Sequence, residues 1–378
     1  MSVITQEEGA GVDFAALRTA RRQRVLAEME RRNVDALVVW REANAKYISG
    51  ARRLWRAVVT AFSPGCVLVR ATGAVHLMNT WDDGIPRDIP NANLYGLSWN
   101  PQNYVEALRR VEGLGDARRI GVDGMSSFFA KMLPAVAPNA ELCDGEDLLR
   151  SVRAVKLPAE VACIQIAIAV AEGALVDVIE AIRPGVTERH LLGIFDQRMT
   201  SFGVTTPAVE GPFCAVERDG TLRQLPGDRA LVDGDLVALS PAVLYAGYEG
   251  GVGRTWPCGT APAGASGLYS RWQRVYDAIE AACVPGAVPS DLRRAYQATG
   301  EPLAPLPIAH GVGLGVESPM VGGSLGPDIV PSAPLQVGMV LALQAFVAQP
   351  GVGGYLGKEI VHLTDDGPAR LTRLAHHL

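Results

Sequence analysis

The first part of the chain mixes helical and strand-like hydrophobic patterns. In residues 14–33 the apolar side chains recur at helical spacing, and the pattern ends at Asn33. Short apolar runs follow at 35–40, 57–70 and 73–79, and such runs are typical of strands. Strands mixed with amphipathic helices predict a compact α/β module.

The second part opens with a longer helical pattern. Apolar residues continue in steps of three and four from Pro158, which suits a first helical turn, to Ile182, and an Arg-Pro-Gly sequence then ends the predicted helix. Thr187 can cap a second helix, with Glu188 in its first turn, where the helix dipole favours negative charge. Beyond it, apolar segments alternate with glycine-containing turns, which predicts a strand-rich half.

The length supports two domains. A chain of 378 residues exceeds the size that one hydrophobic core usually serves. Together with the change of pattern, this length predicts an α/β protein with domains at residues 1–150 and 151–378.

Charge and cysteine content narrow the class of protein. A net charge of -5 offers no basic surface for nucleic acid, and the six cysteines have no C-x-x-C or zinc-ligand spacing. The first 14 residues are polar and acidic, unlike a signal peptide, and no segment is expected to span a bilayer. We therefore expect a cytoplasmic protein that acts on a small molecule and has no nucleic-acid or membrane partner.

Six short motifs occur in fixed order in the second half: RPG with Thr-Glu (183–188), GDLV (234–237), Gly-Tyr followed by Arg-Thr (247–255), HGVGL (310–314), GMVL (338–341) and GKEIVHLTDDGP (357–368). Each alone is weak, but the ordered set is specific. The set resembles the M24 peptidase family, which includes methionine aminopeptidase, aminopeptidase P, prolidase and creatinase. The resemblance implies a pita-bread domain preceded by a smaller creatinase-type α/β domain.

The resemblance also implies a metal site. Metal-dependent members of the family hold two divalent cations with two aspartates, one histidine and two glutamates, and oxygen ligands suit such ions. The two aspartates align with Ser240 and Gly251, and one glutamate aligns with Gln344. His310 and Glu359 keep the histidine and the last glutamate. Because three of five ligands are missing, we expect no paired metal ions and no other cofactor.

Four residues in or shortly after these motifs are candidates for catalysis. His310 is the candidate general acid or base, and its alternative is a structural histidine. Glu359 lies in an apolar strand, so it must find a partner or shift its pKa, and its alternative is a structural ion pair. Gln344 keeps hydrogen-bonding capacity without charge. Glu317 lies where the resemblance places a loop that lines the substrate site.

Further residues are candidates for substrate binding. Arg254 can hold a carboxylate in its planar fork or form an internal salt bridge with Glu359 or Glu249. Tyr248, Glu249 and Ser240 surround the Gly-Tyr turn, and either face the site or close a hairpin. Lys358 alternates to the strand face opposite Glu359 and is expected to face solvent.

Two candidates lie in the first domain. Arg52 and Trp55 occupy a stretch that, in creatinase-type domains, reaches over the partner subunit's substrate site, and an arginine beside a tryptophan can receive an acidic substrate. The alternative is an ordinary surface loop. The resemblance implies a homodimer.

The loss of metal ligands beside intact scaffold motifs predicts a metal-independent, creatinase-like enzyme. It would hydrolyse or eliminate at a C–N or related bond of a small polar, carboxylate-bearing substrate. One departure from creatinase is that residues 222–228 lack the histidine that serves there as its proton shuttle. Two alternatives remain, a non-catalytic binding protein and a Xaa-Pro metallopeptidase with unusual ligands.

Overall fold

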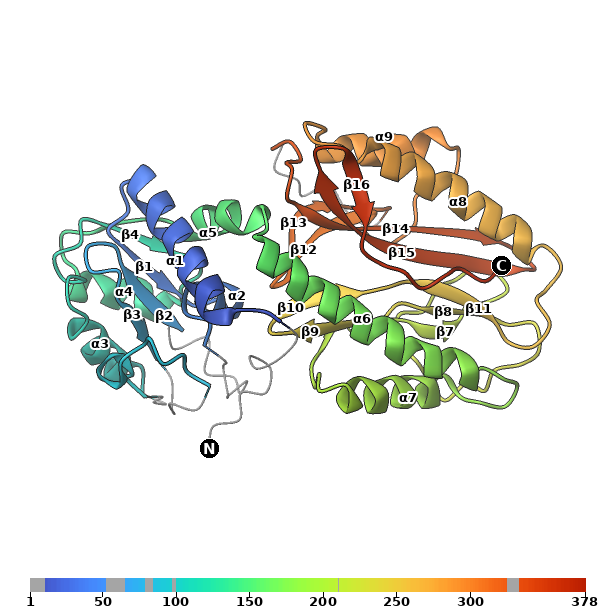
Figure 1. Cartoon of the computed structure of the whole chain (residues 1–378), viewed down its shortest axis with the longest axis horizontal. Helices are drawn as coiled ribbons and strands as arrows, with labels where there is room; N and C mark the ends of the chain where they lie inside the picture. The colour runs from blue at the N-terminus through green and yellow to red at the C-terminus, as the bar shows by residue number, and fades with distance from the viewer. Residues whose placement is uncertain (1–10, 52–64, 79–83, 97–99, 210, 325–332) are drawn as a thin grey trace. The chain divides into compact units, whose positions relative to one another are not determined.

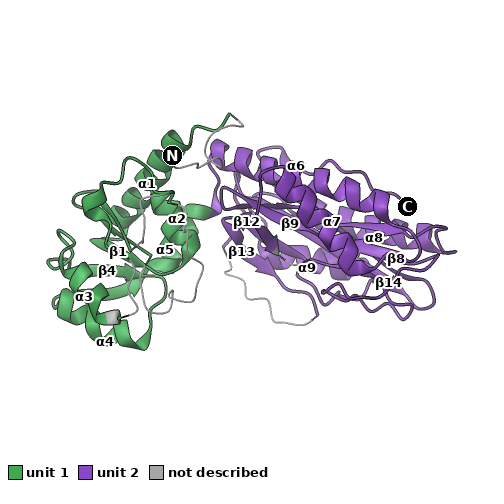
Figure 2. Ribbon diagram, turned by 90° about the horizontal axis from the view of Figure 1, so that it is seen from below, with its two compact units in different colours: residues 1–153 green, residues 154–378 purple. Residues whose placement is uncertain are grey.

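A computed structural model describes residues 11–51, 65–78, 84–96, 100–209, 211–324 and 333–378. The chain forms two compact units, Met1–Arg153 and Ala154–Leu378 (Figure 2). Each unit has a core of its own.

The first unit is built on a five-stranded sheet in the order β3-β2-β1-β4-β5. Strands β1, β4 and β5 run parallel, whereas β2 and β3 are antiparallel to their neighbours. The strands are β1 Ala36–Val39, β2 Cys66–Val69, β3 Val75–Leu77, β4 Arg119–Val122 and β5 Glu141–Asp144. The helices are α1 Phe14–Arg31, α2 Glu42–Ser49, η2 Asn91–Asn93, α3 Pro101–Arg109, α4 Ser127–Val136 and α5 Gly145–Ala154.

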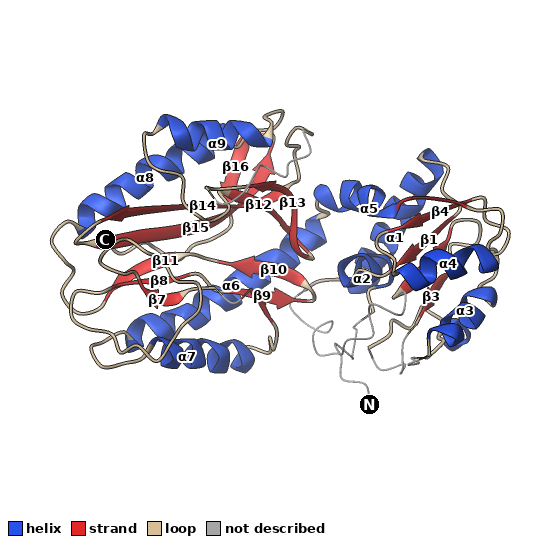
Figure 3. Cartoon of the chain, turned by 180° about the vertical axis from the view of Figure 1, so that it is seen from behind, coloured by secondary structure: helices blue, strands red, loops and turns tan. Residues whose placement is uncertain are grey.

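The second unit has four layers, which make up the pita-bread fold (Figures 1 and 3). Helices α8 (Ala265–Ala282) and α9 (Pro289–Ala298) cover a five-stranded sheet in the order β13-β12-β14-β15-β16. Its strands are β12 Ala309–Gly313, β13 Gly315–Val321, β14 Val340–Gln349, β15 Gly353–Thr364 and β16 Gly367–Arg370. Helices α6 (Pro158–Ala181) and α7 (Glu188–Ser201) cover two three-stranded sheets, whose strands are β6 Pro207–Val209, β7 Phe213–Ala215, β8 Leu236–Leu239, β9 Ala242–Tyr245, β10 Tyr248–Gly251 and β11 Arg254–Pro257.

The two helices that open this unit begin where the sequence predicts. Pro158 is the first residue of α6, and the Thr187 hydroxyl accepts a hydrogen bond from the His190 amide at the start of α7. The expectation that no segment is long enough to span a bilayer is wrong, because the 24 residues of α6 are long and apolar enough to do so when only length and composition are considered. In the fold, α6 packs on β9, β10 and α7, as a core helix does.

The pairing of β14 with β15 sorts side chains onto two faces. Leu343 pairs with Glu359, and Gln344 pairs with Lys358. Because side chains alternate along a strand, each pair projects from one face and the next pair from the other. Leu343 belongs to the core formed with Trp272 of α8, so this face is covered by that helix. We call it the outer face, and we call the face that carries Gln344 and Lys358 the inner face.

The chain end is anchored through a buried carboxylate. Glu359 accepts hydrogen bonds from Thr372, from Arg254 at 3.1 Å and from His376 Nε2 at 2.8 Å. Arg254 Nε also donates to the Leu374 carbonyl at 2.8 Å, and the Tyr355 hydroxyl bonds to His376 Nδ1 at 2.6 Å. Burial by itself raises the pKa of Glu359, but the His376 hydrogen bond and the Arg254 charge outweigh burial and lower this pKa below its usual value.

Gly250 marks a close approach of β10 to α6, and it provides a first prediction. A Cβ at this position would lie 2.4 Å from the Ile168 amide nitrogen and 2.5 Å from the Ala167 Cβ. Gly250→Ala is therefore expected to lower the free energy of unfolding by about 1–3 kcal/mol, measured by urea denaturation.

Gly193 serves as the matched control. It lies inside α7 with nothing within 4 Å of an added Cβ. Gly193→Ala should raise the free energy of unfolding by about 0.5–1 kcal/mol, because alanine loses less backbone entropy in a helix. Equal effects of the two substitutions would contradict the packing argument.

A second prediction concerns the anchored end. Because its pKa is lowered on folding, Glu359 stabilises the fold when ionised, and this contribution is lost as the pH falls from 4.5 through the lowered value. Glu359→Gln should lower the free energy of unfolding at pH 7 by about 3–5 kcal/mol. The difference from the wild type should shrink in acid.

Glu180→Gln is the control for this second prediction, because Glu180 is exposed on α6 of the same unit. Its effect should stay within about 0.5 kcal/mol. Chemical denaturation of both variants between pH 3 and pH 7 measures the effect. A constant difference between Glu359→Gln and the wild type over that range would show that the carboxylate charge does not matter.

Candidate functional site

Four polar side chains lie together at the inner face: Glu249, His310, Gln344 and Lys358. His310 of β12 pairs with Ala342, which lies on the same face of β14 as Gln344. Glu249 comes from β10, which contacts both β12 and β15. Its Oε1 lies 3.7 Å from His310 Nε2. We call these four residues the inner-face cluster.

Two atoms of the cluster have no hydrogen-bond partner among the described residues. His310 Nε2 and Glu249 Oε2 are buried and unpaired in the part of the chain that the structure describes. Gln344 differs, since its Nε2 donates to the Pro307 carbonyl at 2.9 Å. A glutamate could not donate this bond, so the neutral amide suits the position. Glu249 and His310 therefore retain free hydrogen-bonding capacity toward a ligand.

Lys358 lies in the cluster, contrary to the sequence-based expectation. It was expected to face solvent, but only 6% of it is exposed. Burial lowers the pKa of its ammonium, and the Glu249 charge offsets part of that effect. Gly253 lets the chain approach it, because a Cβ on Gly253 would lie 2.6 Å from the Lys358 Cβ. The sequence signal was weak, since β15 is buried on both faces and shows no alternation.

Glu359 does not lie with His310. It projects from the outer face, where Arg254, Thr372 and His376 satisfy it. The ligands of one metal pair must converge on one side of the sheet. The position that meets this condition, opposite Gln344, is Lys358, so the alignment of the last family glutamate with Glu359 is one residue out of register.

Two candidate substrate-binding residues are engaged elsewhere. Arg254 is buried and donates to Glu359 and to the carbonyls of Gly253, Lys358 and Leu374, so its fork is not open to a substrate carboxylate. The Tyr248 hydroxyl donates to Glu160 of α6 at 2.6 Å. Alternation along β10 thus turns Tyr248 toward α6 and Glu249 toward His310.

Glu317 is part of a buried ion pair. Its carboxylate lies 2.8 Å from Lys156 Nζ and also accepts from the Leu314 amide at 3.1 Å. The side chains of Glu317 and Lys156 are 4% and 2% exposed. The structure therefore places Glu317 in a structural contact between β13 and the segment before α6, and the sequence did not identify Lys156 as its partner.

The remaining candidates are Ser240, Arg52 and Trp55. Ser240 is buried and follows β8, and its amide donates to the Pro212 carbonyl at 3.0 Å. Arg52 and Trp55 lie outside the described residues. The homodimer that the family resemblance implies stays a prediction.

The inner face does not fit a pair of divalent cations. Among the described residues, no group of three or more His, Cys, Asp and Glu side chains could hold a metal ion. A side chain at Gly251 is excluded as well, because its Cβ would lie 2.5 Å from the Pro241 carbonyl oxygen. With Ser240, Gln344 and Lys358 at the other positions, His310 alone keeps its ligand type. An ammonium in place of a carboxylate repels the ions.

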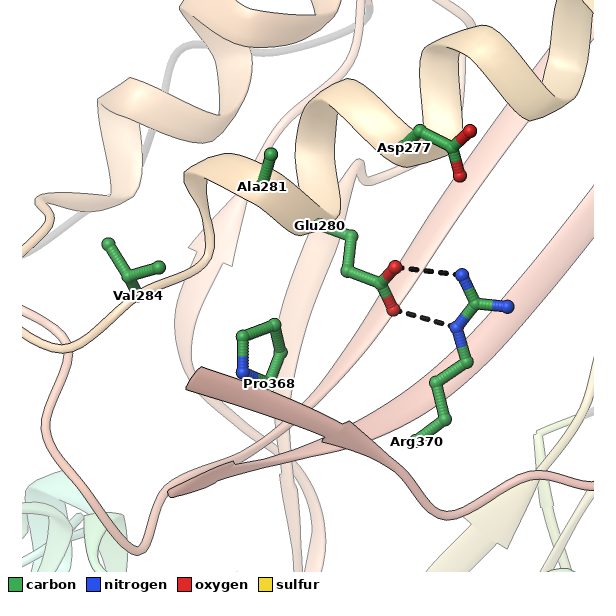
Figure 4. A pocket seen from close by; sticks show the side chains of 6 residues that line it. All are labelled: Asp277, Glu280, Ala281, Val284, Pro368 and Arg370. Carbon is green, nitrogen blue, oxygen red and sulfur yellow. Dashed lines mark hydrogen bonds and ion pairs between the residues drawn. The ribbon is translucent and has the colours of Figure 1, made fainter. Parts of the chain in front are cut away.

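Two surface pockets lie away from this cluster, and each contains an arginine that is already paired with a carboxylate. One of about 430 Å³ lies between α8 and β16, where Arg370 donates twice to Glu280 at 2.7 Å (Figure 4). Another of about 880 Å³ lies in the first unit, where Asp35 pairs with Arg70 at 2.7 Å and accepts from two backbone amides. Neither offers the unpaired buried groups of the inner face.

Comparison with known proteins agrees with this fold. Residues 162–365 match the model of "Metallopeptidase family M24", and residues 21–155 match "Creatinase/Prolidase N-terminal domain". A Xaa-Pro dipeptidase of Pyrococcus horikoshii is 23% identical, with 94% of this chain and 97% of the relative covered. Creatinase of a Bacillus species is 24% identical, with 94% and 90% covered.

The solved structures agree as well. The crystal structure of the prolidase from Pyrococcus horikoshii superposes with a TM-score of 0.76 at 21% identity, covering 95% of this chain and 99% of that one. At this identity the likeness shows the fold. Because the family model covers residues 162–365, more than half of the chain, this protein belongs to metallopeptidase family M24.

Proposed function

We propose that this chain acts on short peptides of the Xaa-Pro class. The observation that carries the proposal is its match, over 94% of the chain and through both units, to a Xaa-Pro dipeptidase. The prolidase fold extends over 95% of the chain as well. A hydrolase of small peptides is also consistent with the expected small-molecule substrate.

The expectation of a metal-independent, creatinase-like enzyme acting on a C–N bond is wrong. Xaa-Pro dipeptidases correspond to this chain along nearly its whole length in sequence and in fold. The error lay in treating the loss of metal ligands as evidence for a different reaction. That loss concerns only which ions the residues can hold, and the substrate class depends on other parts of the site.

His310 is the group of this chain that suits proton transfer. Cleavage of a peptide bond requires a proton on the departing nitrogen, and an imidazole ring can accept a proton at one step and donate it at the next. Within the described residues its Nε2 has no hydrogen-bond partner, and Glu249 Oε1 lies 3.7 Å from it, where it can orient the ring. We derive no step through a metal pair, because the residues present do not fit one.

A second candidate is peptide binding without hydrolysis. The observation that favours it is the replacement of metal-ligand carboxylates by Gln344 and Lys358 at the inner face. A peptidase scaffold that keeps its substrate site and loses its ligands would still bind a peptide.

One experiment separates these candidates. The purified chain is mixed with Gly-Pro, Ala-Pro and Leu-Pro, with EDTA or with added Mn²⁺, and both proline release and calorimetric binding are measured. Hydrolysis is expected, and His310→Ala should slow it by about 10²–10⁴-fold through loss of proton transfer.

The outcomes are distinct, and His190→Ala is the control, because His190 is exposed on α7. Binding without proline release would replace hydrolysis by the second candidate. Neither binding nor release, with all three peptides in both buffers, would show that the Xaa-Pro class is wrong.

A further inference from the structure

Two opposite charges at the inner face, those of Lys358 and Glu249, are buried without a close, hydrogen-bonded ion pair, although Glu249 Oε1 lies 3.7 Å from His310 Nε2. Lys358 is 6% exposed and Glu249 is 2% exposed. In the described parts of the chain, no hydrogen bond or ion pair joins the Lys358 ammonium to another side chain, and Glu249 acts on it only at longer range. Glu249 Oε2 is likewise unpaired. Buried charges are costly unless they are paired.

This arrangement contrasts with the other buried charges of the same unit. Glu359 has Arg254, Thr372 and His376, and Glu317 has Lys156. These charges are compensated within the chain. Lys358 and Glu249 are not, although β10 and β15, which carry them, lie in contact. A ligand that brings one negative and one positive group would compensate both.

We propose that Lys358 is the resident cation of the inner-face cluster and binds the carboxylate of a zwitterionic peptide, whose ammonium group binds Glu249. The inference rests on the proposed function, because a free short peptide carries both charges. Lys358 lies at the position where the corrected family alignment puts a metal ligand. The positive charge of its ammonium group would take the place of the bound metal ions.

The neighbouring residues support this assignment. Gly253 forms an isolated bridge with Lys358 and leaves space for its side chain, which a Cβ would take. Gln344, across from Lys358, is held by Pro307 and brings no negative charge to compete for the ammonium. Met320, paired with His310 on β13, is 36% exposed and offers an apolar surface beside the cluster.

The peptide experiment compares Gly-Pro with Gly-prolinamide, which lacks the carboxylate, and with N-acetyl-Gly-Pro, which lacks the ammonium. The wild type should bind Gly-Pro at least about tenfold more tightly than either analogue, since charge-assisted hydrogen bonds are the strong ones. Lys358→Met should bind Gly-Pro and the amide equally. Glu249→Gln should bind Gly-Pro and the acetylated peptide equally.

Lys131→Met is the matched control, because Lys131 is exposed on α4 of the first unit. It should keep the wild-type preference. Equal affinity of the wild type for Gly-Pro and Gly-prolinamide would overturn the role of Lys358. So would an unchanged preference in Lys358→Met.

A thermal readout separates ligand binding from a structural role. Removing both buried charges in the double variant Lys358→Met/Glu249→Gln should raise the unfolding midpoint above that of the wild type. A fall in the midpoint of this double variant would show that the two charges stabilise the fold, against the proposal.

A second experiment needs no peptide. Lys358→Glu puts a carboxylate beside His310 and Glu249, which makes three ligand groups at one face. Calorimetry should detect about one Mn²⁺ per chain in this variant and none in the wild type or in Lys358→Met. Circular dichroism checks that each variant is folded.

The two experiments fail in different ways. Stoichiometric Mn²⁺ binding by the wild type that is lost in His310→Ala would overturn Lys358 as the resident cation. If no peptide binds the wild type while the Mn²⁺ results are as expected, the proposed Xaa-Pro function and the peptide-binding role of Lys358 are both wrong, and only the replacement of metal ions by the Lys358 ammonium stands.

Discussion

The pairing register between β14 and β15 is the constraint on which the second unit depends. It sets Leu343 opposite Glu359 and Gln344 opposite Lys358. Because side chains alternate along a strand, a shift of one residue would exchange the two faces. Glu359 would then enter the inner face, and Lys358 would meet the aromatic core under α8. The ten-residue ladder between the strands, with apolar Leu341, Leu343 and Val347 against α8, excludes this shift.

Buried charges serve two purposes in this unit. The two purposes differ in whether the charge has an oppositely charged partner within the chain. Glu359 is fully compensated and fastens the C-terminal residues to the sheet. A pair of that kind makes one arrangement of the chain end favourable, because each alternative leaves a charge unpaired. Lys358 and Glu249 lack partners of this kind, so their burial lowers the stability of the fold. Uncompensated groups of this kind are typical of sites that bind charged ligands, where stability is exchanged for function.

This protein keeps the scaffold of the family but not the residues of the family metal site. The scaffold depends on backbone features that the sequence retains, such as the glycines that let β10 approach α6 and β11 approach β15. The metal site depends on carboxylates, and these are replaced. At Gly251 the replacement extends to the backbone, because the Pro241 carbonyl occupies the place of a side chain. A single substitution there would not restore an aspartate without moving the strand.

Local patterns in the sequence determined the elements and the family. The proline at the start of α6 and the threonine cap of α7 mark the starts of two helices, because capping and turn chemistry act between near neighbours. The ordered motifs identify the family by resemblance, and the family implies the pita-bread fold. His310, Glu249 and Gln344 were found in the same way. The sequence did not show which side chains of β15 lie on which face of the sheet, because both faces are buried and the hydrophobic pattern does not alternate. Only tertiary pairing decided that Lys358 faces His310 while Glu359 meets Arg254 and His376, because these partners lie far apart in the chain and register is a property of two strands together.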